Sequence, residues 1–298
     1  MRRITAIVNP IAGTGARSGA GEARTRQARA GFAAHGIEAD IRLTEGPGHA
    51  ADLTRQAIAA GAPLVFAWGG DGTVNEIASV LAFTQTPLAL IPAGSGNGLA
   101  RSLGIPRPPV RAIAHALACE PRAIDVGELG GRLFFNVAGV GLDAHVARLF
   151  DERPANPRGF GSYVTIAFRE IWRHTPIEYR VRLEADVLKG RADVLVLANG
   201  PEYGNGARIA PGAVVDDGWL DLVAVEARPA ATNLLRAVRL MTGSFGGASG
   251  VRTRRCRHFT LTSTAPMDFH VDGQPVTGGQ SLVGRVHPAA LRVRWSTR

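Results

Sequence analysis

The sequence predicts an α/β protein in two parts: an N-terminal doubly wound domain built on a parallel sheet, and a second, β-rich and mostly antiparallel domain. Strand and helix patterns alternate through the first part of the chain, which is typical of parallel sheets. Afterwards most strands are separated by turn residues rather than by helices. A chain of 298 residues is long for one compact unit. We therefore expect domains at 1–127 and 128–298, with the last strand free to return to the first domain.

In the first domain, apolar strands alternate with helical patterns. The helix after the third strand is expected to begin near Thr73, because Val74, Ile77, Ala78 and Leu81 follow helical spacing. The strands are expected at 3–10, 37–44, 62–68 and 87–92, and the other helices before Gly36, at 48–61 and around 109–118. In a sheet of this type, ligands bind at the carboxyl ends of the strands.

The second domain opens with a predicted hairpin, whose turn is formed by Gly130 and Gly131. Further strands are expected at 177–186, 190–200, 218–227, 258–263 and 267–273, and helices at 158–173 and 229–243. In the second of these helices, Leu234, Leu235, Val238 and Met241 have the spacing of a packed core helix. A groove wall or a membrane-facing surface is the alternative interpretation of this helix.

Composition limits the class of protein. Hydrophobic residues make up 45% and charged residues 20% of the chain, as in soluble globular proteins. No apolar run approaches the roughly 20 residues of a membrane span. In the opening MRRITAIVNP, the apolar run ITAIV ends before Pro10 and is too short for the core of a signal peptide. We therefore expect a cytoplasmic protein. Cys119 and Cys256 lack metal-binding spacing.

The formal net charge of +9 comes almost entirely from arginine, since Lys189 is the only lysine. Two interpretations stay open: a basic surface for an anionic partner, or the arginine-rich composition of a GC-rich genome. A Walker P-loop is excluded, because it requires a lysine after its glycines. Nucleic-acid binding is disfavoured, because the sequence lacks an aromatic-interleaved basic sheet and a recognition helix.

Three glycine-rich loops follow predicted strands, at 9–15, 69–73 and 92–101. Glycines let another molecule approach the backbone, and the start of a helix favours phosphate. Asp71, in GGDGT, would repel a phosphate placed there alone. It suits the site if it binds Mg²⁺ or accepts a proton from an attacking hydroxyl. A tight turn in which Asp71 caps the helix is the structural alternative.

These loops, NPIAG, GGDGTVNEI and PAGSGNGLAR, together with DVGEL, FFNVAGVGLDA, the segment 196–225 and VDGQP, resemble the diacylglycerol kinase catalytic domain family. This family includes bacterial lipid kinases and the sphingosine and ceramide kinases. The resemblance covers nearly the whole chain. It implies two lobes with ATP in the cleft between them, and transfer of the γ-phosphoryl group to a lipid hydroxyl.

The resemblance also implies roles for individual residues. Asp71 is expected to be the central acid of phosphoryl transfer, supported by Asp125. The residues expected to line the nucleotide site are Asn9, Gly69, Gly70, Gly72, Thr73, Gly94, Ser95 and Asn97. Asp216 and Asp217 are the expected Mg²⁺ ligands, although DDG is also an ordinary turn sequence.

One departure from the family affects catalysis. Relatives commonly have a glutamate in DGE, whereas this chain has Gln274, which cannot act as a base. Asp272 is two residues away and is expected to point to the opposite face of a strand. Asp71 is then the remaining base, and Gln274 is expected to orient the hydroxyl. We expect activity to persist, because phosphoryl transfer depends mainly on positioning and on charge neutralisation.

The sequence therefore predicts an ATP- and Mg²⁺-dependent lipid kinase that meets its substrate at the inner membrane surface through peripheral contact. Two alternatives remain: a kinase of the NAD-kinase type with a soluble acceptor, and a nucleotide- or lipid-binding protein impaired by Gln274. The identity of the lipid and the oligomeric state, monomer or homodimer, stay open.

Overall fold

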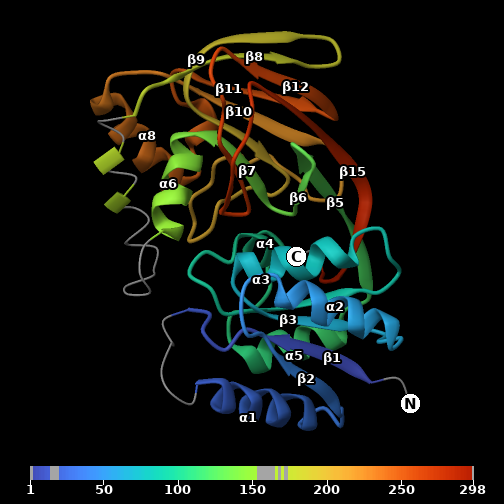
Figure 1. Ribbon diagram of the computed structural model, residues 1–298. Helices are drawn as coiled ribbons and strands as arrows, with labels where there is room; N and C mark the ends of the chain where they lie inside the picture. Colours follow the sequence, from blue (N-terminus) through green and yellow to red (C-terminus); the bar gives the residue numbers. More distant parts are fainter. Residues whose placement is uncertain (1–2, 14–19, 153–164, 167–168, 171–173, 297–298) are drawn as a thin grey trace. The chain divides into compact units, whose positions relative to one another are not determined.

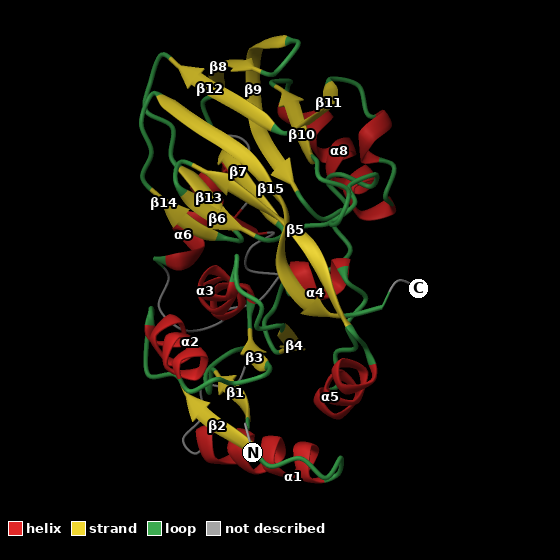
Figure 2. Cartoon of the chain, turned by 90° about the vertical axis from the view of Figure 1, so that its right-hand side faces the viewer, coloured by secondary structure: helices red, strands yellow, loops and turns green. Residues whose placement is uncertain are grey.

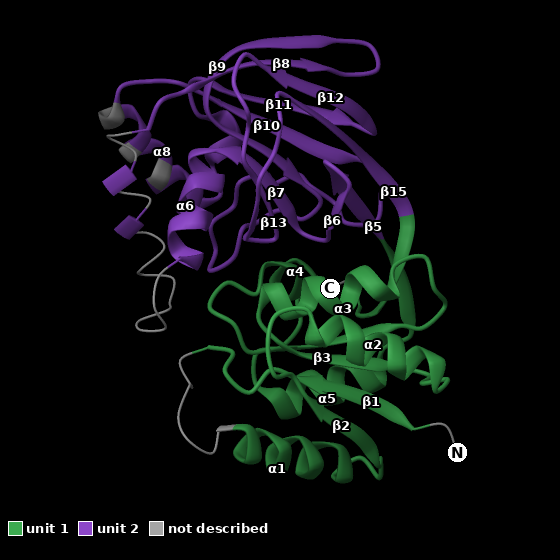
Figure 3. Ribbon diagram, viewed as in Figure 1, with its two compact units in different colours: residues 1–124, 289–298 green, residues 125–288 purple. Residues whose placement is uncertain are grey.

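The computed structural model describes residues 3–13, 20–152, 165–166, 169–170 and 174–296 (Figure 1). It forms two compact units, shown in Figure 3. The first consists of Met1–Ile124 and Ala289–Arg298, and the second of Asp125–Pro288. Within the described ranges, no helix is both long and apolar enough to cross a membrane.

The first unit is the predicted doubly wound domain. It contains β1 (Ile4–Val8), α1 (Ala20–Ala33), β2 (Ala39–Leu43), α2 (His49–Ala59), β3 (Val65–Gly69), α3 (Asp71–Leu81), β4 (Leu88–Pro92), α4 (Gly98–Ser102) and α5 (Pro109–Ala118). Its strands are parallel in the order β2-β1-β3-β4, and the end of β15 (Ser281–Arg294) pairs with β4. The strand order reverses at β1 and β3, which is where ligands bind in such sheets.

Helices cover both faces of this sheet (Figure 2): α2 packs with α3, and α1 packs with α5. Every residue of β3 and β4 is buried, which explains why both appear in the sequence as continuous apolar runs. Phe32 of α1 meets Phe66 of β3 edge to face, with ring centroids 4.9 Å apart. The helix expected to begin near Thr73 begins at Asp71, because Gly70 is its extended N-cap residue.

The second unit is antiparallel, as expected. Its strands are β5 (Pro121–Leu129, which begins in the first unit), β6 (Arg132–Phe134), β7 (Val137–Gly141), β8 (Ile177–Arg182), β9 (Val187–Ala198), β10 (Leu220–Glu226), β11 (Val251–Cys256), β12 (His258–Ser263), β13 (Phe269–Val271), β14 (Gln274–Val276) and most of β15. The predicted Gly130–Gly131 hairpin is confirmed, with Leu129 opposite Arg132 and positive φ at both glycines.

The strand β9 is central to this unit and pairs with β7, β8 and β10. Its residues alternate between two cores. Leu195 and Leu197 belong to one core, and Val196 and Ala198 to the other. The second core is also contacted by the helix α8 (Ala230–Thr242) and the short helix η1 (Phe245–Gly247).

The remaining points concern two helices and the boundary between the units. The sequence analysis missed the helix α6 (Leu142–Asp151), which follows β7 directly and buries Leu142, Ala144 and Val146. Most of the helix expected at 158–173 lies outside the described residues. The boundary between the units falls within β5, after Ile124, rather than at residue 127, because this strand continues from one unit into the other.

Candidate functional site

The three glycine-rich loops gather at the carboxyl ends of β1, β3 and β4 in the first unit. The second and third loops touch through backbone atoms at Gly70 and Gly94. A Cβ atom added to Gly94 would lie 2.6 Å from the Cα atom of Gly70, and one on Gly70 would lie 3.2 Å from Gly94. Only glycine permits this approach at both positions. These two glycines therefore hold the loops together, a role that the sequence alone did not indicate.

The first loop joins the same cluster. Gly13 has a φ of +80°, and an added Cβ atom would lie 2.6 Å from the carbonyl oxygen of Ala93 in the third loop. Arg24 of α1 closes the first loop, since its guanidinium donates to the carbonyl oxygens of Asn9 and Ala12. Burial lowers the pKa of Arg24. The sequence analysis missed this residue because its partners are backbone atoms, which leave no trace in the sequence.

Asp71 is the first residue of α3, and its carboxylate links the second loop to the third. Its Oδ2 atom accepts the N–H of Asn97 at 2.8 Å, and its Oδ1 atom accepts the N–H of Gly98 at 2.7 Å. Asp71 thus satisfies amides at the start of the helix α4, which otherwise have no partner within that helix. The structural alternative predicted that Asp71 caps the helix it precedes. Asp71 does act as a cap, but it caps α4. The chemical role of Asp71 stays a prediction.

The polar residues expected at the nucleotide also connect the loops. The Nδ2 group of Asn9 donates to the Oγ1 atom of Thr73 at 2.9 Å. Asn97, in the left-handed region at φ 54°, accepts the N–H of Gly94 at 2.8 Å and donates back to its carbonyl oxygen at 2.7 Å. The loops are thereby fixed by their own hydrogen bonds.

The structure places the other expected nucleotide-binding residues in the same cluster. Gly69 ends β3, Gly72 lies in the first turn of α3, and Ser95 lies in the third loop. Glu76 of α3 holds the start of α2 by accepting the N–H groups of Gly48 at 2.9 Å and Ala50 at 3.1 Å. The whole set expected from the sequence therefore converges in space, although ligand contact by each residue stays a prediction.

In the second unit, Gln274 is the first residue of β14 and is half-buried. It follows a two-residue turn, Asp272–Gly273, in which both residues have positive φ. The Asp272 carboxylate accepts three backbone N–H groups, from Phe135 at 2.9 Å, Asn136 at 3.0 Å and Val137 at 3.1 Å. The expectation that Asp272 points to the opposite face of a strand is wrong, because the residue lies in the turn.

Asp125 is buried and also lies in the second unit. Its carboxylate accepts the N–H of Gly218 at 2.6 Å, and its own N–H donates to the carbonyl oxygen of Val215 at 2.7 Å. Asp125 therefore fixes the turn that carries Asp216 and Asp217. Its expected support of Asp71 stays a prediction.

The expected Mg²⁺ ligands, Asp216 and Asp217, are exposed. Asp217 forms an ion pair with Arg255 and accepts the N–H of Trp219 at 3.1 Å. Burial raises the pKa of the nearby Asp221, and the positive charge of Arg255 offsets part of this increase. In the parts of the chain that are described, no group of three or more histidine, cysteine, aspartate or glutamate residues could hold a metal. Mg²⁺ is often held by only one or two carboxylates together with water, so the role of Asp216 and Asp217 as its ligands stays a prediction.

A buried polar cluster lies beside the Gln274 hairpin. The Oδ2 atom of Asp143, on α6, is 2.7 Å from the Nε2 atom of His270 and accepts the hydroxyl of Tyr203 at 2.8 Å. The N–H of Gly273 faces the Nδ1 atom of His270 at 3.2 Å, a bond that only the neutral ring can accept. The sequence analysis included Asp143 in FFNVAGVGLDA and His270 in the strand expected at 267–273, but it assigned a role to neither.

Comparison with known proteins adds two matches to domain families. Residues 3–129 match the diacylglycerol kinase catalytic domain. Residues 136–295 match the YegS C-terminal NAD kinase beta sandwich-like domain.

Similar proteins extend these matches over most of the chain. A "Probable lipid kinase YegS-like" of Pseudomonas syringae pv. syringae is 34% identical over 263 residues, covering 87% of this chain and 84% of the relative. One of Pseudomonas aeruginosa is 31% identical over 277 residues, covering 92% and 90%. The crystal structure of a diacylglycerol kinase from Bacillus anthracis has a TM-score of 0.73 at 18% identity, covering 99% and 97%, and supports the fold alone.

The contact between Gly70 and Gly94 predicts that Gly94→Ala destabilises the first unit. The added methyl group would force the two loops apart, at a cost of about 1–3 kcal/mol, which thermal unfolding should show as a lower Tm. Gly46→Ala is the matched control, since its added Cβ atom meets nothing within 4 Å. Equal Tm values for the two variants would contradict the assigned packing role.

The Asp143–His270 pair predicts a pH dependence of stability. Burial lowers the pKa of His270, but the carboxylates of Asp143 and Asp272 raise it by more. The charged ring gives up the bond from Gly273 and pairs more strongly with Asp143. Because the pKa is higher in the folded state, the stabilisation is complete below about pH 6.5 and is lost as pH rises through the folded-state value.

The measurement is the Tm of the wild type minus that of His270→Gln, followed across this pH range. We expect the difference to fall with rising pH, whereas the exposed control His258→Gln should show little change. A difference that rises with pH would contradict the assignment.

Proposed function

The chain belongs to the diacylglycerol kinase catalytic domain family of YegS-like lipid kinases, and we propose that it transfers the γ-phosphoryl group of ATP to the hydroxyl of a lipid. The observation that carries this proposal is the convergence of three glycine-rich loops on Asp71 at the switch point of the parallel sheet. This is the position at which doubly wound folds bind their ligands.

The loops provide N–H groups and positive charge, which can bind a polyphosphate. The helix α3 begins within the second loop, so its first N–H groups and its positive dipole end favour negative charge. Lys189, the only lysine, lies on β9 and does not follow any of the glycine-rich loops in sequence, as a Walker lysine would. Positive charge at the loops comes instead from Arg24 and from Arg101, whose Nε group donates to the carbonyl oxygen of Gly96 at 3.1 Å.

We further propose that ATP enters as its Mg²⁺ complex, in which the metal offsets phosphate charge. In this scheme the metal reaches the site with the substrate, and binding of a further Mg²⁺ by Asp216 and Asp217 stays a prediction. In the reaction, the bond between the γ-phosphorus and the bridging oxygen breaks, and the lipid oxygen bonds to the phosphorus. We propose that Asp71, oriented by two N–H groups, accepts the hydroxyl proton. The role expected for Gln274, to orient a hydroxyl, stays a prediction.

A second candidate function is phosphorylation of a soluble acceptor such as NAD. It is favoured by one observation, the match of residues 136–295 to an NAD kinase-like β-sandwich domain. Incubation with ATP and either a total lipid extract or NAD, with identification of the phosphorylated product by mass, separates the two. Phosphorylated NAD with no lipid product would favour the soluble acceptor.

We expect Asp71→Asn to lower kcat for lipid phosphorylation by about 10²-fold or more, because the proton acceptor is lost. The new amide would also place an N–H group against the N–H of Asn97 or Gly98, so ATP binding should weaken as well. The measurement is radiolabel transfer from ATP to extracted lipids over a range of ATP concentrations. The exposed Asp52→Asn, which loses an ion pair to Arg55, is the control. Unchanged transfer would exclude the role of Asp71.

We expect the wild type to be active and Gln274→Glu to raise kcat by about tenfold or more, since a glutamate at this position can share the work of the base. Gln280→Glu, an exposed change of the same kind, is the control in the same assay. An inactive wild type that gains turnover only through Gln274→Glu would favour the remaining alternative, a binding protein that has lost catalysis.

A further inference from the structure

The helix α8 presents to solvent the face that was expected to pack in the core. Its side chains Leu235, Val238 and Met241 are 70%, 59% and 50% exposed, although their spacing predicts a core helix. Asn233 and Arg236 are buried instead. The core-helix expectation is therefore wrong for these three residues, which we name the α8 stripe.

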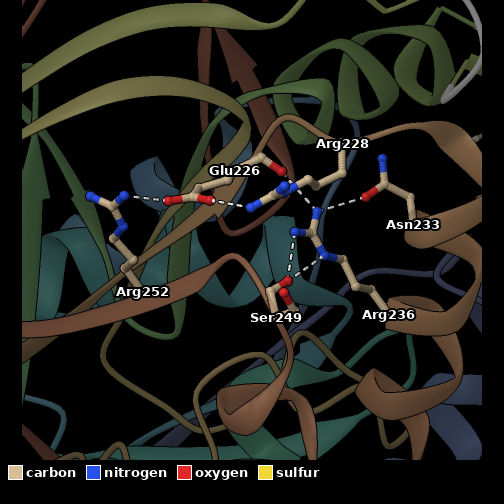
Figure 4. A network of polar contacts seen from close by, with 6 residues as sticks. All are labelled: Glu226, Arg228, Asn233, Arg236, Ser249 and Arg252. Atoms are coloured by element: carbon tan, nitrogen blue, oxygen red, sulfur yellow. Dashed lines mark hydrogen bonds and ion pairs between the residues drawn. The ribbon is translucent and has the colours of Figure 1, made fainter.

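Arg236 fixes this orientation (Figure 4). Its guanidinium donates to the backbone oxygen of Glu226 at 2.8 Å, to the Oδ1 atom of Asn233 at 2.8 Å and to the backbone oxygen of Ser249 at 2.8 Å. Asn233 in turn donates to the buried carboxylate of Asp193 at 2.9 Å. Rotation of α8 would leave these polar groups buried without partners, which is costly.

Packing supports the same rotation. Leu240 lies seven residues after Asn233 and packs against the core that contains Val196 and Phe245. Positions 233, 236 and 240 therefore form the inner face of α8, and the α8 stripe lies on the outer face. Three adjacent apolar side chains on one exposed face are typical of a contact surface rather than of scattered surface residues.

The charge of α8 and of the segment that follows it favours an anionic partner. Residues 227–267 contain no aspartate or glutamate but seven arginines: Arg228, Arg236, Arg239, Arg252, Arg254, Arg255 and Arg257. Arg236 is buried, and Arg254 and Arg255 form ion pairs with Asp186 and Asp217. Glu226 is shared between Arg228 and Arg252, so one acid is divided between two cations (Figure 4). Arg239 of α8 and Arg208, which borders the Gly243 cap, are both exposed. This surface complements an anionic one.

We propose that the α8 stripe docks the protein on an anionic lipid bilayer. The apolar side chains enter the interface, and the surrounding arginines attract the headgroups. This inference rests on the proposed function, because the long-chain acceptor of a lipid kinase resides in a membrane. No residue of the α8 stripe belongs to the proposed transfer site, so each can be tested alone.

The test is sedimentation of the full chain with vesicles of equal parts phosphatidylglycerol and phosphatidylcholine, without ATP. We expect the wild type to bind these vesicles, with an affinity that falls as the salt concentration rises. The triple variant Leu235→Gln/Val238→Gln/Met241→Gln should bind about tenfold more weakly or worse, because each substitution removes apolar area from the contact. Val187→Gln/Val214→Gln/Val283→Gln is the matched control, since these three side chains of the same unit are about as exposed, at 47%, 47% and 51%. The control should bind like the wild type.

Several outcomes would overturn the proposal: no binding of the wild type, or equal binding by the α8 and control variants. If the α8 variant had a lower Tm than the wild type, another part of the chain would cover the α8 stripe. If the wild type were a dimer and the α8 variant a monomer, a second copy of the chain would cover it. Phosphoryl transfer to a water-soluble short-chain diacylglycerol is measured in parallel and should be unaffected. Vesicle binding through the stripe without transfer to any lipid would leave the docking surface intact and refute the proposed function.

Discussion

The arrangement of the candidate site depends on one interaction, the acceptance of two backbone N–H groups by the Asp71 carboxylate. Asp71 is separated from Asn97 by 26 residues, so this bond closes the second loop on the third. The glycine contact between the same loops requires that closure, since Gly70 and Gly94 touch only when their loops meet. The hydrogen bond between Asn9 and Thr73 then attaches the first loop. A charged acceptor suits this role, because its hydrogen bonds are stronger than those of a neutral group.

The same use of acids recurs in the second unit. Asp272 gathers three N–H groups from residues 135–137, and Asp125 holds the N–H of Gly218. Each acid fixes a turn that carries a predicted site residue: Asp272 precedes Gln274, and Asp125 supports the turn at Asp217. Sequence reasoning treats an acid in a glycine-rich turn as a candidate for chemistry. In this chain such acids organise the backbone, and any catalytic role must be compatible with that.

The sequence predicted the α/β fold, the antiparallel second part and the convergence of the glycine-rich loops, because strand periodicity and turn residues are local signals. It did not predict the orientation of α8. Apolar spacing placed Leu235 and Val238 inward, but the buried bonds of Arg236 outweigh that preference. It also missed Arg24 and the Asp143–His270 pair. The partners of Arg24 are backbone carbonyl oxygens, which carry no sequence signal, and Asp143 and His270 are 127 residues apart.

Gln274 and Asp71 together define where rate enhancement in this chain can come from. A neutral amide at position 274 removes one carboxylate, and Asp71 already supports two hydrogen bonds. General-base catalysis contributes about 10²–10⁴-fold, whereas positioning and electrostatic stabilisation contribute most of the acceleration in phosphoryl transfer. Interlocked loops supply positioning, because hydrogen bonds within the protein fix their amides before the substrate arrives. The close fit of Gly70 against Gly94 is therefore expected to matter for catalysis as much as any single proton acceptor.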